Sequence, residues 1–233
     1  MILPLHDDNP TRTRPVVTIA LIVACILVFI WEISHGSQNA QRIIYSMGAI
    51  PAVLLGHRVL PPDLVVMPSI FSVVTSMFLH GGLWHLLGNM LYLWIFGNNV
   101  EDAMGHGRFI VFYLICGLAA VLAQALPHPE STVPMVGASG AISGVLGAYM
   151  LLYPHARVLL GLPLGIFIFR IGRFRAVWVL AAWFAMQLVM NLFASNDEAQ
   201  SGVAFRAHIG GFVAGATLIP FMKQRNVKLW RRR

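Results

Sequence analysis

Charged side chains are scarce in this chain. Only 11% of its 233 residues are Asp, Glu, Lys or Arg, whereas a soluble globular domain carries about 25%. The nine acidic residues all lie between the long apolar runs or at their ends. This shortage argues against an ordinary soluble domain. It also disfavours an intramembrane aspartyl protease, which needs two aspartates at membrane depth.

Cysteines and metal-binding motifs are equally sparse. The two cysteines, Cys25 and Cys116, each stand in the middle of an apolar run, where cysteine usually acts as a small hydrophobic residue. We therefore expect no disulfide, no thiol nucleophile and no metal site. The sequence contains no His-Glu-x-x-His motif, which disfavours a zinc protease.

Long apolar runs are what the chain has in abundance. Hydrophobic residues make up 58% of it, and its mean hydropathy is +0.73. Six runs approach the minimum length of about 17 residues that crosses a bilayer as a helix. They lie at 16–31, 83–100, 109–126, 136–153, 177–193 and 207–222. The runs predict an all-α, polytopic membrane protein with a bundle of six transmembrane helices. A shorter apolar run, 158–169, is broken by Pro163 and is typical of an interfacial or re-entrant segment.

The basic residues predict how these spans are oriented. The net charge is +7, and 13 of the 16 Lys and Arg fall in segments 1–15, 101–108, 154–176 and 223–233. The positive-inside rule places these segments, and both termini, in the cytoplasm. We expect a cytoplasmic N-terminal segment (1–15) without a cleaved signal, a six-span domain (16–222) and a basic cytoplasmic tail (223–233). The tail is typical of anchoring to lipid headgroups rather than of binding to nucleic acid.

Three polar side chains are predicted to lie at one depth in the membrane. In this topology the second, fourth and sixth spans run from outside to inside, and His85, Ser139 and His208 each lie near the start of one of them. A lone serine in a span usually packs or bonds to its own helix, and a lone histidine at a span end is usually interfacial. Because polar groups at membrane depth are costly, the coincidence of three favours a shared functional site on the outer side.

Glycines in two of these spans predict how the polar residues meet. The small residues are Gly140 and Gly144 in the fourth span and Gly211 and Gly215 in the sixth. Such stripes let helix backbones approach closely in lipid. If the two spans pack through them, His208 lies beside Ser139.

This arrangement favours nucleophilic catalysis by serine. A serine hydroxyl needs a base to take its proton, and His208 is the candidate base for Ser139. With no acid inside a span, the sequence predicts a Ser-His dyad rather than a triad. His85 and Asn89 lie four residues apart on one helical face and, with the backbone N–H groups near Ser139, are candidate donors to an oxyanion. Gln187 and Asn191, four apart in the fifth span, are interpreted as polar contacts between helices.

Three motifs resemble the rhomboid intramembrane serine proteases. They are "TSMFLHGGLWHLLGNMLYLWIFGNNVED" (75–102), "GASGAISGVLGAYM" (137–150) and "AHIGGFVAG" (207–215). The resemblance implies that Ser139 is the nucleophile and His208 the base, and that His85, Asn89 and the Ser139 amide form the oxyanion hole. It also implies cleavage of transmembrane protein substrates in or near their membrane segments, without a metal or cofactor.

The chain departs from the family pattern at two places. Where many members have a Trp-Arg pair in the first loop, this sequence has Phe71 and Ser72. Where many have an aromatic residue that stacks on the catalytic histidine, this sequence has Ser143. The orientation of His208 must therefore depend on other packing.

Two alternative functions fit the same composition. One is a catalytically inactive rhomboid-like protein that binds membrane proteins or serves in quality control, although such relatives lose the serine or the histidine. The other is a small transporter, which is disfavoured because no inverted repeat is present. As the location we expect a bacterial cytoplasmic membrane, with the active site facing outside.

Overall fold

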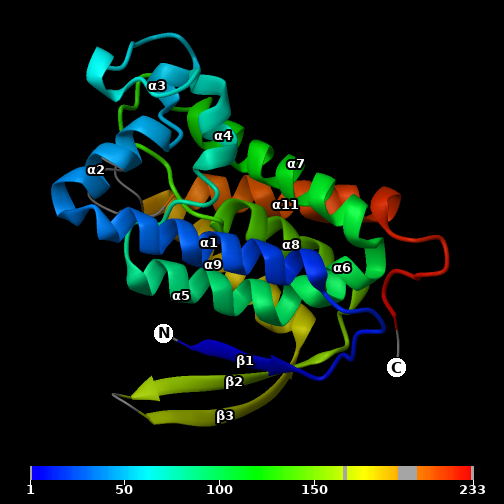
Figure 1. The fold of residues 1–233 in the computed structure, drawn as a ribbon. Coiled ribbons are helices and arrows are strands. Elements are labelled where there is room, and N and C mark those ends of the chain that lie inside the picture. The colour runs from blue at the N-terminus through cyan, green and yellow to red at the C-terminus, as the bar shows by residue number, and fades with distance from the viewer. Residues whose placement is uncertain (1, 165–166, 194–203, 232–233) are drawn as a thin grey trace.

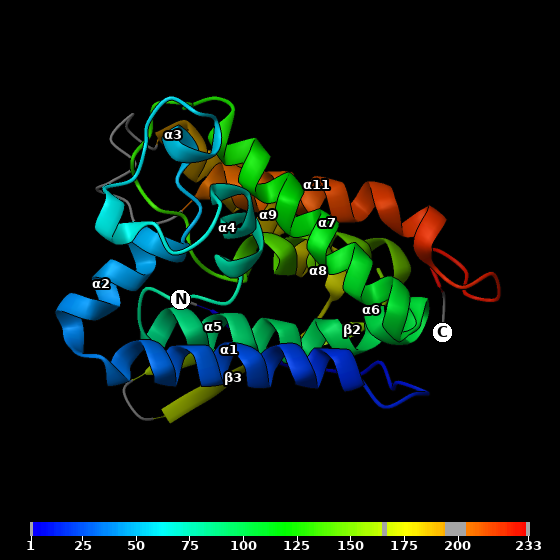
Figure 2. The ribbon, with the colours of Figure 1, turned by 45° about the horizontal axis from the view of Figure 1, so that its top comes forward.

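The computed structural model describes residues 2–164, 167–193 and 204–231, which form a helical bundle with a small sheet along one side (Figure 1). The helices are α1 (Val16–Ser34), α2 (Gly36–Met47), α3 (Pro51–Leu54), α4 (Ser72–Thr75), α5 (Leu83–Tyr92), α6 (Asn98–Met104), α7 (His106–Ala125), α8 (Ser139–Leu152), α9 (Ala176–Phe193) and α11 (Phe205–Met222). The axes of the long helices are roughly aligned, while α2, α3 and α4 gather at one end of the bundle and α6 lies toward the other (Figure 2).

The apolar runs predicted from the sequence lie largely within helices, so the mostly helical fold is confirmed. Among the described residues, α1, α7 and α9 are the helices long and apolar enough to cross a membrane, and α8 is a shorter apolar helix. The second run forms α5 and α6, which a π-helical stretch (Leu93–Gly97) joins into one continuous segment. Helices suit such runs because they satisfy every backbone polar group without water.

Helix α8 lies inside the bundle and carries the closest backbone contacts. Eleven of its 14 residues are buried. A Cβ atom added to Gly211 of α11 would overlap the carbonyl oxygen of Gly140, and one added to Gly215 would overlap that of Gly144. Helices α8 and α11 therefore pack backbone to backbone, a distance that only glycine permits at these positions.

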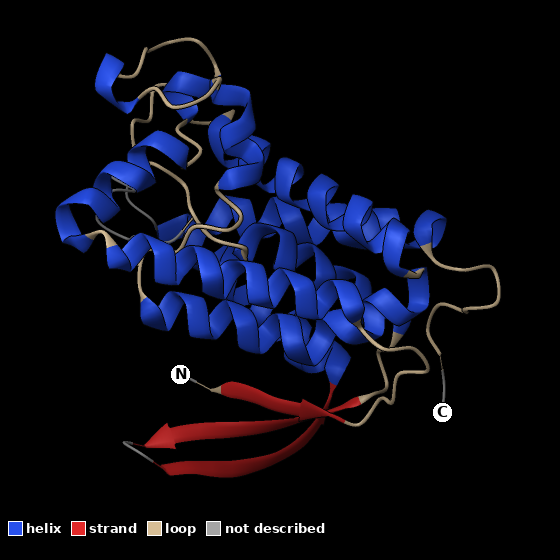
Figure 3. Cartoon of the chain, in the orientation of Figure 1, coloured by secondary structure: helices blue, strands red, loops and turns tan. Residues whose placement is uncertain are grey.

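A three-stranded antiparallel sheet corrects the all-α prediction for residues 3–7, 157–164 and 167–175. Its strands, in spatial order, are β1 (Leu3–Asp7), β2 (Arg157–Leu164) and β3 (Phe167–Arg175). The interpretation of 158–169 as an interfacial or re-entrant segment missed this pairing. Pro163 disfavours a helix here, and the apolar and aromatic residues of β2 and β3 suit strands. Figure 3 shows the sheet beside the helices, with β1 as the strand nearest to them.

The first long loop holds the departure from the family pattern at Phe71 and Ser72. Phe71 ends a short 3-10 turn (Ser69–Phe71) and is 57% exposed. Ser72 is buried, and its hydroxyl donates to the carbonyl oxygen of Ser69 at 2.6 Å. Ser72 therefore closes the local turn, whereas Phe71 offers an apolar side chain at the surface.

Candidate active site

Ser139 is the first residue of α8 and follows a tight loop. Gly137 in that loop has a φ of +118°, a conformation that residues other than glycine rarely adopt. A Cβ atom at this position would lie 2.7 Å from the ring of His85. The first N–H groups of a helix have no partner within it, so the Ser139 hydroxyl stands at the electropositive end of α8.

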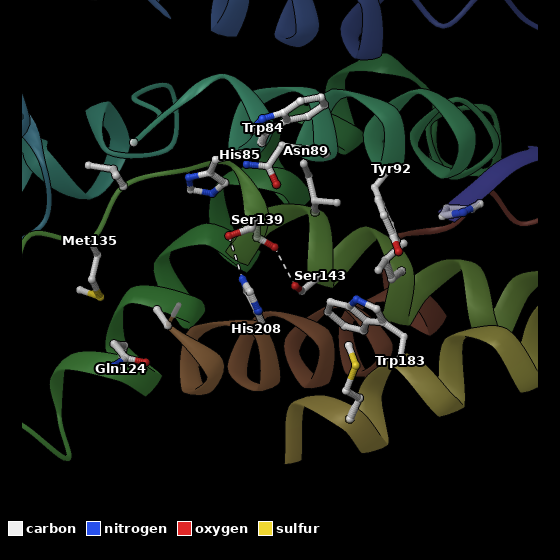
Figure 4. Close-up of a pocket in the computed structure, with 18 of the residues that line it drawn as sticks. Trp84, His85, Asn89, Tyr92, Gln124, Met135, Ser139, Ser143, Trp183 and His208 are labelled. Carbon is white, nitrogen blue, oxygen red and sulfur yellow. Dashed lines mark hydrogen bonds between the residues drawn. The ribbon is translucent and has the colours of Figure 1, made fainter. Parts of the chain in front are cut away.

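His208 reaches Ser139 across the close contact between α11 and α8. Its Nε2 lies 2.9 Å from the Ser139 Oγ, which is hydrogen-bond distance. Figure 4 shows Ser139 between His208 on one side and His85 and Asn89 on the other. The structure therefore brings together in one site the four polar residues that the sequence singled out.

Gln187 of α9 is a site residue that the sequence reasoning missed. Its Oε1 lies 2.8 Å from the Nδ1 of His208, and its side chain is buried. In this orientation of the Gln187 amide, the carbonyl oxygen accepts and Nδ1 donates the imidazole proton. In the neutral ring Nε2 then has a free lone pair, which accepts the hydrogen of the Ser139 hydroxyl. The signal in the sequence that could have identified Gln187 as a site residue was its polar side chain inside an apolar span.

Trp183, also on α9, supplies the aromatic contact that position 143 lacks. Its ring centroid is 5.9 Å from that of His208, and the two planes are tilted by 38°. The hydroxyl of Ser143 instead donates to the carbonyl oxygen of Ser139 at 2.7 Å, within α8 itself. His208 is thus oriented from α9, by Gln187 through a hydrogen bond and by Trp183 through ring packing.

His85 and Asn89 of α5 face the loop that precedes Ser139. Both approach Gly137, since a Cβ atom there would also lie 3.5 Å from the Asn89 Nδ2. Asn89 is buried, and within the described part of the chain its Nδ2 has no hydrogen-bond partner. A buried amide donor without a partner is costly, so its hydrogens are available to an acceptor that enters the site.

These side chains open into a pocket of about 930 Å³. Its walls come from α5, α8, α9 and α11, from residues 131–136, and from the sheet. Most of the lining is apolar, including Trp84, Tyr92, Trp183 and Met186. Over the described ranges, no group of three His, Cys, Asp or Glu side chains is placed to hold a metal ion. The pocket therefore combines an apolar lining with a few convergent polar groups, which is typical of a binding site.

A comparison with protein families decides the identity of this fold. The model of the rhomboid domain matches residues 68–225, which is more than half of the chain. The chain belongs to the rhomboid family. The match includes Ser139, Gln187 and His208, as well as the α5 residues that face them.

Individual relatives agree with this assignment. The rhomboid chain is 34% identical over 202 residues to Rhomboid protein 1, mitochondrial, of Saccharomyces cerevisiae, covering 78% of this chain and 54% of that one. It is 34% identical over 138 residues to Rhomboid protease GluP of Bacillus subtilis, covering 59% and 24%. It is 28% identical over 209 residues to Rhomboid protease GlpG of Salmonella choleraesuis, covering 89% and 63%. The chain thus spans less than two thirds of the length of each of these relatives.

Proposed function

We propose that this rhomboid is an intramembrane serine endopeptidase that cleaves transmembrane protein substrates in or near their membrane segments. The observation that carries the proposal is the 2.9 Å contact between the Ser139 Oγ and the His208 Nε2 at the start of α8. Two relatives named as rhomboid proteases, GluP and GlpG, support the same reaction class.

In the first half of the reaction, Ser139 forms an acyl-enzyme. His208 Nε2 takes the hydroxyl proton while Oγ bonds to the carbonyl carbon of the scissile peptide. The oxyanion accepts hydrogen bonds from the Asn89 amide, from His85 and from the Ser139 backbone N–H. His208 then gives its proton to the leaving amine, and the C–N bond breaks.

In the second half, water hydrolyses the acyl ester. His208 takes a proton from the water as its oxygen attacks the ester carbon, and then returns a proton to the Ser139 Oγ as the bond to serine breaks. In both halves His208 keeps the same orientation, because its Nδ1–H stays hydrogen-bonded to the Gln187 Oε1. The chemistry needs no metal or cofactor, because the residues named supply the nucleophile, the base and the oxyanion donors.

The direct test of this function is cleavage by the purified full-length protein. It should release two fragments from some members of a panel of single-span membrane proteins, and a Ser139→Ala protein should release none. Fragments that appear equally with both proteins would come from a contaminant and would contradict the proposal.

Gln187 acts in this mechanism as a positioning residue. Gln187→Leu should lower kcat by about 10-fold, because His208 then loses the acceptor that selects its tautomer, whereas KM should change little. Gln187→Glu should keep most of the activity and shift the acid limb of the kcat profile to higher pH, because a carboxylate stabilises the imidazolium. Measuring kcat against pH for both variants checks this role. If both variants keep the wild-type profile, Gln187 does not orient His208.

We further propose six spans within 16–222, with the segments 1–15 and 223–233 joining the membrane domain from the cytoplasmic side. β1 and β2 run from that side along the bundle, so that Pro4 and Leu160 reach the pocket (Figure 1). The distribution of Lys and Arg supports this topology. It opens the site to the outer side. We propose a bacterial cytoplasmic membrane as the location, because the relatives GluP and GlpG come from bacteria. A reporter fused after Arg233 that is active only outside the cytoplasm should remain silent, and strong activity would reverse the topology.

A further inference from the structure

The sheet closes one side of the candidate active-site pocket. Ile2, which precedes β1, Pro4 of β1 and Leu160 of β2 line the pocket together with residues of α5 and α9. β1 packs against α5, whereas β2 packs against α9, so the sheet bridges the two helices. In Figure 4, Tyr92 of α5 and Trp183 of α9 stand on the same side of the pocket, opposite Met135 and Gln124.

β1 is held firmly at the end that lies away from this pocket. Asp7 is buried, and its Oδ2 accepts hydrogen bonds from the Tyr149 hydroxyl at 2.5 Å and from the Asn99 amide at 3.1 Å. Burial raises the pKa of Asp7, and the hydrogen bond from Tyr149 acts in the opposite direction. The next residue, Asp8, accepts from the backbone N–H of Arg157 at 2.7 Å. These contacts hold the last residue of β1, Asp7, beside the start of β2.

The part of β1 that reaches the pocket pairs weakly. The strand has five residues, and its register with β2 shifts between Pro4 and His6. Proline has no N–H to donate, and a bulge leaves one residue out of the ladder. Pro4 pairs with Leu160 at the point where both residues line the pocket. The ladder is thus weakest where β1 lines the pocket.

β2 would expose backbone groups to the pocket if β1 left. Its other edge already pairs with β3 along the whole strand, from Arg157 to Leu164. Unpaired N–H and C=O groups in apolar surroundings are costly, so the vacated edge would favour another extended segment. A peptide without proline would make a more complete ladder with β2 than β1 does.

We propose that β1 is a displaceable strand that covers the edge of β2 beside the active site and gives way to an extended segment of the substrate. The proposal rests on the function proposed above, because it concerns how a polypeptide reaches Ser139. It predicts that fixing β1 to β2 blocks large substrates and spares small reagents that enter from the aqueous side.

A disulfide between β1 and β2 tests this proposal. Pro4→Cys/Leu160→Cys places cysteines at paired positions of antiparallel strands, where Cα atoms are about 4.5–5.5 Å apart, within disulfide range. Full-length protein oxidised with diamide is compared with the same protein after reduction. The matched control is Leu162→Cys/Phe169→Cys, which joins β2 to β3 at a paired position outside the pocket.

Oxidation of the β1–β2 pair should slow cleavage of a transmembrane substrate at least about tenfold, because fewer molecules are competent to bind it. Labelling of Ser139 by a small fluorophosphonate should continue at the rate of the reduced protein, and the control pair should cleave equally in both states. Equal cleavage by the locked and reduced protein would overturn the proposal. Loss of labelling on oxidation would also overturn it, since β1 would then support the site. Absence of cleavage by the wild-type protein would instead refute the proposed function.

Discussion

His208→Ala should lower the rate of substrate cleavage by roughly 10⁴-fold or more, the loss that follows removal of the base in a serine protease. The reason is that the Ser139 hydroxyl then has no group to accept its proton, because among the described residues no other titratable side chain lies within hydrogen-bond distance of that oxygen. Ser139→Ala should cause a similar loss. The double variant should be no worse than either single one, because the two residues act as one unit.

The measurement is single-turnover cleavage with each variant at equal concentration. Thr217→Ala is a suitable control, since Thr217 lies on the same helix and its exposed hydroxyl donates to the carbonyl groups of Val213 and Ala214 in that helix. This control should cleave at the wild-type rate. If the losses in His208→Ala and Ser139→Ala instead multiply in the double variant, the two residues do not share a step.

Asn89→Ala should slow cleavage by about 10²–10³-fold, the usual effect of removing one oxyanion donor. Its thermal stability should be unchanged or slightly higher, because the Asn89 Nδ2 has no partner to lose within the described ranges. The change should appear in kcat rather than in KM, since the oxyanion exists only in the transition state and the tetrahedral intermediate.

Asn99→Ala provides the opposite pattern as a control. The Asn99 side chain accepts from the amide of Asn9 at 2.6 Å and donates to Asp7 at 3.1 Å, away from Ser139. Its removal should lower the melting temperature more than it lowers kcat. An Asn89→Ala protein that melts early and keeps its kcat would give Asn89 a structural role only.

Much of the helical architecture could be predicted because apolar runs leave the backbone one simple solution in a membrane. Because polar groups are costly at membrane depth, the polar residues at span ends could be recognised as candidates for a site. The glycine stripes indicated that the fourth and sixth spans pack closely against each other. Ser139 and His208, predicted as neighbours on these grounds, lie 2.9 Å apart. The family assignment followed from motifs around these residues, and the rhomboid domain match confirms it.

The parts that escaped prediction depend on long-range pairing. β1 and β2 are separated by about 150 residues, and no local pattern in "LPLHD" indicates a strand partner. Gln187 was recognised as polar, but its partner is 21 residues away on another helix. Trp183 resembles any aromatic residue of an apolar span. Only the packing of α9 against α8 and α11 reveals that both residues face His208.

The site of covalent labelling tests most directly whether Ser139 is the activated nucleophile. A membrane-impermeant fluorophosphonate applied from outside should form an adduct on Ser139, identified by mass spectrometry of the labelled peptide. Ser143 lies in the same peptide and is the internal control, because its hydroxyl is bound to the Ser139 carbonyl oxygen. Labelling should disappear in Ser139→Ala and nearly disappear in His208→Ala. An adduct on Ser143, or labelling that persists in Ser139→Ala, would contradict the claim.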